Sequence, residues 1–152
     1  MVPDLPETAE AADAAEVPVS VGFLYRAAHY EHGATGDARQ MAEVFLKELL
    51  DLFALPPCER LGYDVALVVT ELLTNAQRYA PGPCLLELEG HATEISVTVW
   101  DSNSALPVVF PRDPGRVGGH GMEIIDRICD EVHVERVPVG KRIRAVLAVP
   151  QV

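Results

Sequence analysis

The sequence predicts an α+β domain, a two-layer α/β sandwich with helices on one face of a mixed, mainly antiparallel sheet. Three observations predict it. Two segments with apolar residues at helical spacing come first, two pairs of segments with alternating apolar residues follow, and a short glycine-led helix separates those pairs. Because strands joined by short turns pair antiparallel, this order favours helices gathered on one face.

Two amphipathic helices are predicted in the first half of the chain. The range 37–53 opens with Asp37 as an N-cap, and the glutamine three residues later completes a capping-box spacing. The prolines at 56–57 end the linker and start a second helix, since proline is tolerated in a first helical turn. This helix runs to Ala80 with one apolar stripe: Leu61, Val65, Val68, Leu72, Ala76 and Tyr79.

The second half of the chain predicts two hairpins. Four segments alternate apolar and polar residues at the period of a strand: 84–89, 94–100, 131–137 and 141–149. Between the hairpins, Ser102–Val117 is a loop long enough to be functional or mobile. A short helix after 118–121 turns Met122, Ile125 and Ile128 inward, and a further short strand is expected within 19–30.

Length and composition predict one domain, 19–152, behind a disordered acidic tail, 1–18, which holds five acids and no Lys or Arg. The net charge of -11 argues against sequence-independent nucleic-acid binding and fits a basic protein partner, or simply solubility. With neither a membrane-length apolar run nor a signal-peptide pattern in the sequence, we expect a cytoplasmic protein. Cys58, Cys84 and Cys129 match no zinc spacing and are expected to be free thiols.

Glu71 and Asn75 are the most informative pair of the chain. They lie four residues apart in an otherwise apolar helix, so they share one helix face. A carboxylate beside an amide oxygen suits a hard cation such as Mg²⁺ and the activation of a hydroxyl. A polar edge on a surface helix is the alternative, but apolar neighbours on nearly every side favour burial.

Two later features support a binding site. Asp101 ends an alternating strand and begins the long loop, where it could accept a hydrogen bond from an exocyclic amine such as that of adenine. Gly118–Gly121 has three glycines in four positions before a helix, which lets backbone N–H groups approach a di- or triphosphate. The alternatives are an acid in a turn for Asp101 and a flexible hinge for the glycine segment. We expect His120 to be a loop side chain rather than a metal ligand.

The chain resembles the GHKL (Bergerat-fold) ATP-binding domains shared by DNA gyrase, histidine kinases and the MutL repair protein. The resemblance is carried, in this order, by Glu71–Ala80, Val99–Asn103 and Gly118–Asp126. Within that group the chain is most similar to the small bacterial anti-sigma-factor serine kinases and their actinobacterial relatives. The resemblance covers roughly residues 37–149, and the motifs are specific as a set.

The resemblance implies ATP and Mg²⁺ as ligands and assigns roles to the motif residues. Asn75 would coordinate Mg²⁺, Glu71 would act as the base on the attacking hydroxyl, and Asp101 would bind the adenine amine. The loop Ser102–Val117 would be the lid over the nucleotide. Gly119 and Gly121 would give backbone contacts to phosphate, with Asn103 and His120 as further nucleotide-binding residues. On charge and position alone, Arg78 is a candidate to face the phosphates, as is Arg112 or Arg116 from the lid.

Two positions depart from the family pattern. Asn103 stands where the adenine motif has glycine, and Arg142 follows Gly140 and Lys141 where the last motif has threonine. The second change removes a small hydroxyl expected near adenine. These departures put nucleotide affinity in question, whereas the pair of Glu71 and Asn75 is retained.

The leading hypothesis is a protein-serine kinase that passes the ATP γ-phosphoryl group to a serine of a small antagonist protein. The resemblance implies a sigma factor as a second partner and a homodimer, without direct nucleic-acid or membrane binding. The alternative is a non-catalytic, or weakly nucleotide-binding, module that sequesters a sigma factor or another regulator. A domain split from a histidine kinase is a third hypothesis, which the lack of a phospho-acceptor helix disfavours.

Overall fold

The computed structural model of the chain describes residues 22–31, 34–79, 82–102 and 121–151. The predicted acidic tail and most of the predicted lid lie outside the described residues. So do three predicted site residues: Asn103, Gly119 and His120. The elements in chain order are β1 (Leu24–Tyr30), α2 (Thr35–Leu52), α3 (Glu59–Tyr79), β2 (Cys84–Gly90), β3 (Glu94–Asp101), α4 (Gly121–Ile128), β4 (Glu131–Val137) and β5 (Gly140–Ala148).

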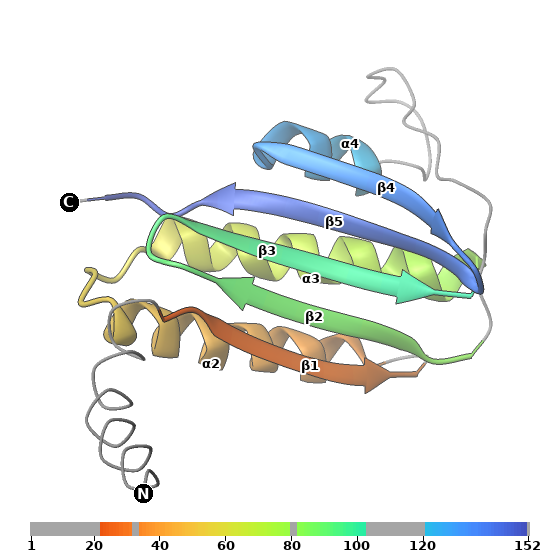
Figure 1. The fold of residues 1–152 in the computed structure, drawn as a ribbon, viewed down its shortest axis with the longest axis horizontal. Coiled ribbons are helices and arrows are strands. Elements are labelled where there is room, and N and C mark those ends of the chain that lie inside the picture. The colour runs from red at the N-terminus through yellow and green to blue at the C-terminus, as the bar shows by residue number, and fades with distance from the viewer. Residues whose placement is uncertain (1–21, 32–33, 80–81, 103–120, 152) are drawn as a thin grey trace, which may run out of the picture.

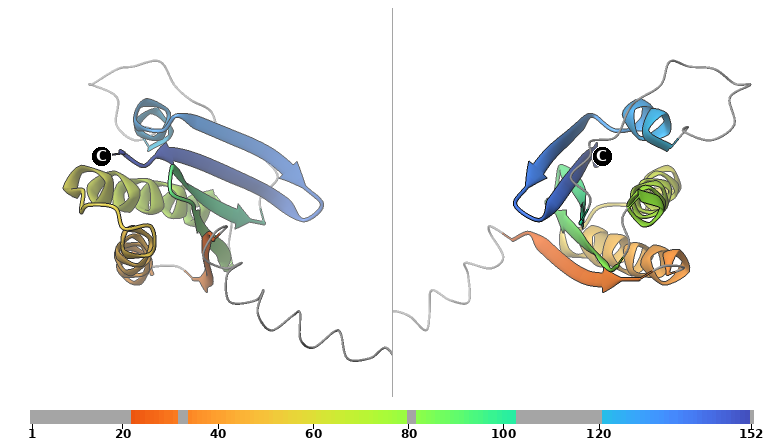
Figure 2. Two further views of the ribbon diagram at one scale, coloured as in Figure 1. Left: turned by 60° about the vertical axis from the view of Figure 1, so that its left-hand side comes forward. Right: turned by 90° about the vertical axis from the view of Figure 1, so that its right-hand side faces the viewer.

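The strands form one five-stranded sheet in the order β1-β2-β3-β5-β4, and every neighbouring pair is antiparallel. Figure 1 shows the sheet in front of the helices, and Figure 2 shows α2, α3 and α4 together on one side of it. The predicted α+β sandwich is therefore confirmed. No helix among the described residues has the length and apolar character needed to cross a bilayer.

The register between β3 and β5 decides which side chains enter the core. Facing pairs on the helix side are Ile95 with Leu147, Val97 with Ala145, and Val99 with Ile143, and all six residues are buried. Because side chains alternate between faces at a period of two, the next pair on this side is Asp101 with Lys141. The apolar ladder thus ends in a charged pair.

The start of α2 differs from the prediction. The helix begins at Thr35 behind Ala34, which makes no side-chain cap hydrogen bond, so Asp37 is not the N-cap. Asp37 lies instead in the first turn, where its negative charge is favourable at the positive end of the helix dipole. In α3 the predicted stripe is buried from Leu61 to Ala76, and the helix starts at Glu59, two residues beyond the prolines.

The face of the sheet away from the helices carries a polar chain with one residue from each strand. The Tyr25 hydroxyl and the Trp100 indole N–H donate to the two carboxylate oxygens of Glu87. The Arg142 guanidinium lies 5.1 Å from the Trp100 ring centroid and is paired with Glu135. These contacts hold side chains of all five strands in register on the solvent side.

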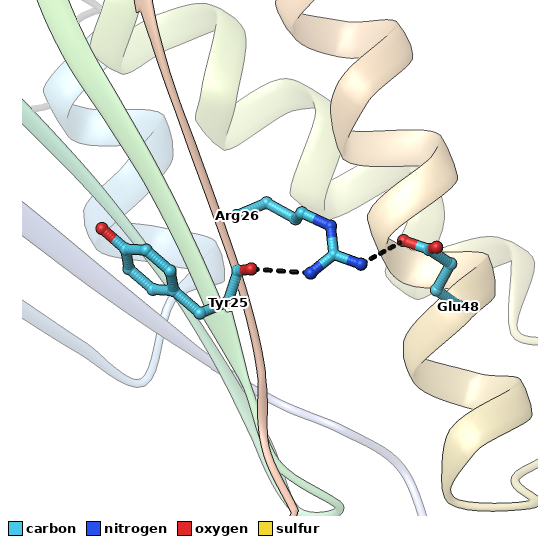
Figure 3. A network of polar contacts seen from close by, with 3 residues as sticks. All are labelled: Tyr25, Arg26 and Glu48. Atoms are coloured by element: carbon cyan, nitrogen blue, oxygen red, sulfur yellow. Dashed lines mark hydrogen bonds and ion pairs between the residues drawn. The ribbon is translucent and has the colours of Figure 1, made fainter.

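Arg26 ties the edge strand β1 to α2. Figure 3 shows its guanidinium donating to the backbone oxygen of Tyr25 at 2.8 Å and reaching the Glu48 carboxylate at 3.4 Å. Both charged side chains are nearly half exposed, so this pair contributes little to stability. The groove that it borders has Met41 and Phe45 among its lining residues.

The three cysteines are free thiols, as predicted. Burial raises the pKa of Cys129 to about 12, and the negative charges of Asp130, Asp64 and Asp126 add to the effect. Burial also raises the pKa of Cys84, with a smaller contribution from the charge of Asp101. Both thiols are therefore protonated at neutral pH and are poor nucleophiles in the folded protein.

We expect the Cys129 thiol to make folding sensitive to alkaline pH. The pKa of this thiol in the folded protein lies above the ordinary value of 9.0. Its contribution to the free energy of unfolding is therefore complete below pH 9.0 and is lost as pH rises toward about 12. Urea unfolding of wild type and Cys129→Ala at several pH values checks this. The wild type should lose more stability across that window than the variant does, and parallel curves would contradict the assignment.

We expect Gly140→Ala to destabilise the protein strongly. Gly140 has φ +151, and a Cβ added there would lie 1.8 Å from the backbone oxygen of Asp101. The clash involves backbone atoms that cannot rotate away, so we expect a loss of about 3 kcal/mol or more. Chemical denaturation measures it.

Gly36→Ala in α2 is the matched control, because a Cβ there meets no atom within 4 Å. Because alanine has the higher helix propensity, this substitution should raise the free energy of unfolding by up to about 1 kcal/mol. Equal effects of the two substitutions would show that the close approach at Gly140 is not real.

Candidate functional site

Glu71 and Asn75 project from the same face of α3, one helical turn apart. Their neighbours Leu72, Leu73 and Ala76 are buried, and both polar residues are themselves partly buried. The sequence-based expectation that this pair does not lie on a freely solvated helix face is therefore confirmed.

The Glu71 carboxylate lies against the start of α4. A Cβ built on Gly121 would be 3.0 Å from Glu71 Oε1, so glycine at this position leaves the carboxylate its space. The structure thus brings together two predicted site residues that are fifty positions apart in the sequence. The backbone N–H groups of the first turn of α4 carry the positive end of a helix dipole, which suits an anionic ligand.

Asn75 presents a buried acceptor atom. Its Oδ1 atom is out of solvent and has no hydrogen-bond partner among the residues that the structure describes. A buried acceptor left in this state costs roughly 1–3 kcal/mol, which is a reason to look for a ligand that completes it.

The chemistry of this atom fits Mg²⁺. Within the described ranges no three His, Cys, Asp or Glu side chains gather into an all-protein metal cage. Mg²⁺ that arrives with phosphates needs only one or two protein oxygens, because phosphates and water complete its shell. Asn75 Oδ1, one helical turn from a carboxylate that lies against the start of α4, fits that requirement.

Asp101 lies in a buried ion pair. Its Oδ2 atom is 2.8 Å from Lys141 Nζ, and the two side chains are 2% and 1% exposed. Removing one partner of such a pair leaves an uncompensated charge and typically costs about 3–5 kcal/mol. The carboxylate that the resemblance assigns to adenine binding is therefore already paired with the ammonium of Lys141.

Arg142 does not lie at Asp101, although the sequence comparison singled it out. It pairs in register with Trp100 on the solvent face of the sheet, and its side chain contacts Trp100 and Glu135. Lys141 is the residue that sequence reasoning missed. The signal was available: Lys141 shares the period-two phase of Ile143 and Ala145, which face the core.

Arg78 lies in the last turn of α3, one turn beyond Asn75, and its side chain is exposed. In Figure 1, α3 and β3 end at the same side of the molecule, so Arg78 and Asn75 come from the end of the helix that lies toward the Asp101 end of the strand. The described residues bring Glu71 to Gly121 and Asp101 to Lys141.

An antiparallel sheet covered on one face by helices, with an unsatisfied amide oxygen beside a carboxylate, is suited to a ligand that carries both a metal ion and an anion. Comparison with protein families identifies the class. The chain belongs to the histidine kinase-like ATPase domain family, whose model matches residues 30–147. It is accordingly a domain of an ATP-binding class. A search of the curated proteins found no match.

We expect Asn75→Ala to separate stability from ligand binding. Removing a buried acceptor that lacks a partner among the described residues should leave the free energy of unfolding unchanged or raise it by up to about 1 kcal/mol. The same variant should lose Mg²⁺-dependent nucleotide binding, measured by calorimetry with and without the metal.

Leu72→Ala is the comparison for stability, because Leu72 is fully buried beside Asn75 and its truncation should cost about 2–5 kcal/mol. If Asn75→Ala proves as destabilising as Leu72→Ala, the amide has a structural role and the metal assignment fails.

Proposed function

We propose that the protein is an ATP-binding regulator of the anti-sigma-factor type, which transfers the γ-phosphoryl group of ATP to a serine of a small antagonist protein. The observation that carries the proposal is the buried Asn75 Oδ1 atom, which has no partner in the described ranges and lies one turn from the Glu71 carboxylate that packs against Gly121. Membership of the histidine kinase-like ATPase domain family supports ATP as the phosphoryl donor.

In this proposal each residue of the α3–α4 side has a distinct role. Asn75 holds Mg²⁺, which neutralises charge on the phosphates when it is bound. Glu71 accepts the proton of the substrate serine hydroxyl as its oxygen bonds to the γ-phosphorus and the bond to ADP breaks. The N–H groups at the start of α4, beginning with Gly121, face the phosphates, and Arg78 supplies positive charge one turn beyond Asn75.

The proposal extends to residues beyond the described ranges and to partners. Gly119 and His120 would add phosphate contacts, and Asn103 would add a contact to the nucleotide. A sigma factor and the small antagonist would be the protein partners, and the active form would be a homodimer. The net charge of -11 supports a basic protein partner rather than nucleic acid.

A second candidate is a non-catalytic module that sequesters a sigma factor or another regulator and binds nucleotide weakly. One specific observation favours it: the Asp101 carboxylate is already held by Lys141 in a buried ion pair. Phosphoryl transfer depends on positioning of the nucleotide, so a weakened contact to the adenine ring would lower the transfer rate.

Transfer of labelled phosphate from ATP to candidate antagonist proteins encoded beside this chain tests the kinase. We expect Glu71→Gln to lower the transfer rate by about 10²- to 10⁴-fold, because it removes the base while keeping the shape of the side chain. Mg-ATP affinity should change little, since Glu71 acts on the hydroxyl and not on the nucleotide.

Thr74→Ala is the control, since Thr74 is exposed on the same helix between the two site residues. Full transfer by Glu71→Gln would remove Glu71 from the mechanism. Tight Mg-ATP binding without transfer by the wild type, on every antagonist offered, would contradict the kinase and favour the sequestering module.

A further inference from the structure

We propose that Lys141 is a specificity-determining residue which takes the base-recognising carboxylate of Asp101 out of use, so that the site binds purine nucleoside triphosphates by their phosphates and metal with little selection for adenine. This inference rests on the proposed function, because it concerns the same nucleotide site. It predicts a broader substrate class, in which Mg-ATP and Mg-GTP bind about equally well.

The first support is the burial of the pair. The Asp101 and Lys141 side chains are 2% and 1% exposed, and their charged atoms are 2.8 Å apart. A carboxylate with so little exposed surface offers almost none to the edge of a base. To bond it, an adenine amine would have to displace an ammonium, and a neutral donor compensates a buried carboxylate less well than a full positive charge does.

The second support is the geometry that holds the two side chains together. Asp101 and Lys141 are paired in the β3–β5 register on the helix side of the sheet, directly after the buried pair of Val99 and Ile143. Gly140 brings its backbone against the Asp101 backbone, since an added Cβ would lie 1.8 Å from that oxygen. The ion pair is thus fixed by the main chain on both strands and does not depend on a surface rotamer.

The third support is that Asn75, on the phosphate side of the site, is not held by a cation as Asp101 is. Within the described part of the chain Asn75 Oδ1 has no hydrogen-bond partner, and the Glu71 carboxylate has its space beside Gly121. Recognition through a metal ion and phosphates therefore stays possible where recognition of the base is suppressed. Because ATP and GTP carry the same triphosphate, groups that contact only this part cannot distinguish them.

The test compares dissociation constants of Mg-ATP and Mg-GTP by calorimetry on the full chain. For the wild type we expect the two values to agree within about threefold, which corresponds to less than one good hydrogen bond to a charged group. For Lys141→Thr, which removes the ammonium, we expect Mg-ATP to bind about tenfold or more tightly than in the wild type, with Mg-GTP unchanged.

Lys141→Met is the second variant, since it keeps the length of the apolar stem and removes only the charge. Both variants leave Asp101 buried without its cation, so we expect them to melt at lower temperature than the wild type. Mg-ATP should then raise their melting temperature more than Mg-GTP does. Arg142→Thr, on the same strand but the opposite face, is the matched control and should leave the ATP-to-GTP ratio unchanged.

The outcomes separate this inference from the proposed function. A wild type that prefers Mg-ATP by more than tenfold overturns the inference, and this measurement needs no variant. So does an unchanged ratio in both Lys141 variants, while the proposed function stands if Asn75→Ala still abolishes binding. If neither nucleotide binds wild type or variants at millimolar concentration, the proposed function fails and this inference falls with it.

Discussion

The register between β3 and β5 is the constraint on which both the core and the candidate site depend. It aligns three buried apolar pairs under the helices and then places Asp101 opposite Lys141 at the same depth. A slip of one residue would turn the whole ladder to solvent and separate the two charges. Gly140 keeps the register at its end, because only a residue without Cβ allows β5 to approach the Asp101 backbone so closely.

The candidate site has a helical side and a sheet side, which differ in whether their polar groups are already paired. On the helical side, α3 carries both residues: the buried Asn75 Oδ1 atom has no hydrogen-bond partner among the described residues, and the Glu71 carboxylate lies against the start of α4. On the sheet side, Asp101 already has its ionic partner within the chain. Under the proposed function, a nucleotide would therefore gain most of its polar contacts from α3 and α4, and fewer from the sheet.

Periodicity alone predicted the helices, both hairpins and the side of α3 that carries Glu71 and Asn75, because these depend on local patterns of apolar residues. The start of α2 was mispredicted, since the capping-box spacing at Asp37 also fits an acid in the first turn. The contact between Glu71 and Gly121 depends on how α4 packs on α3, which no local pattern contains. Lys141 was missed because a motif comparison drew attention to the neighbouring Arg142, and only strand phase distinguishes the two.

The polar chain on the solvent face of the sheet gives the protein an internal optical reporter. Trp100 is the single tryptophan of the sequence. Its indole lies beneath the Arg142 cation and donates to Glu87, and it directly precedes Asp101 in β3. Indole emission shifts with nearby charge, so a rearrangement at the end of β3 would change the colour of this one fluorophore. Changes at Asp101, on the helix-facing side of β3, can thus be followed by the intrinsic fluorescence of Trp100 on the opposite face, without any added label.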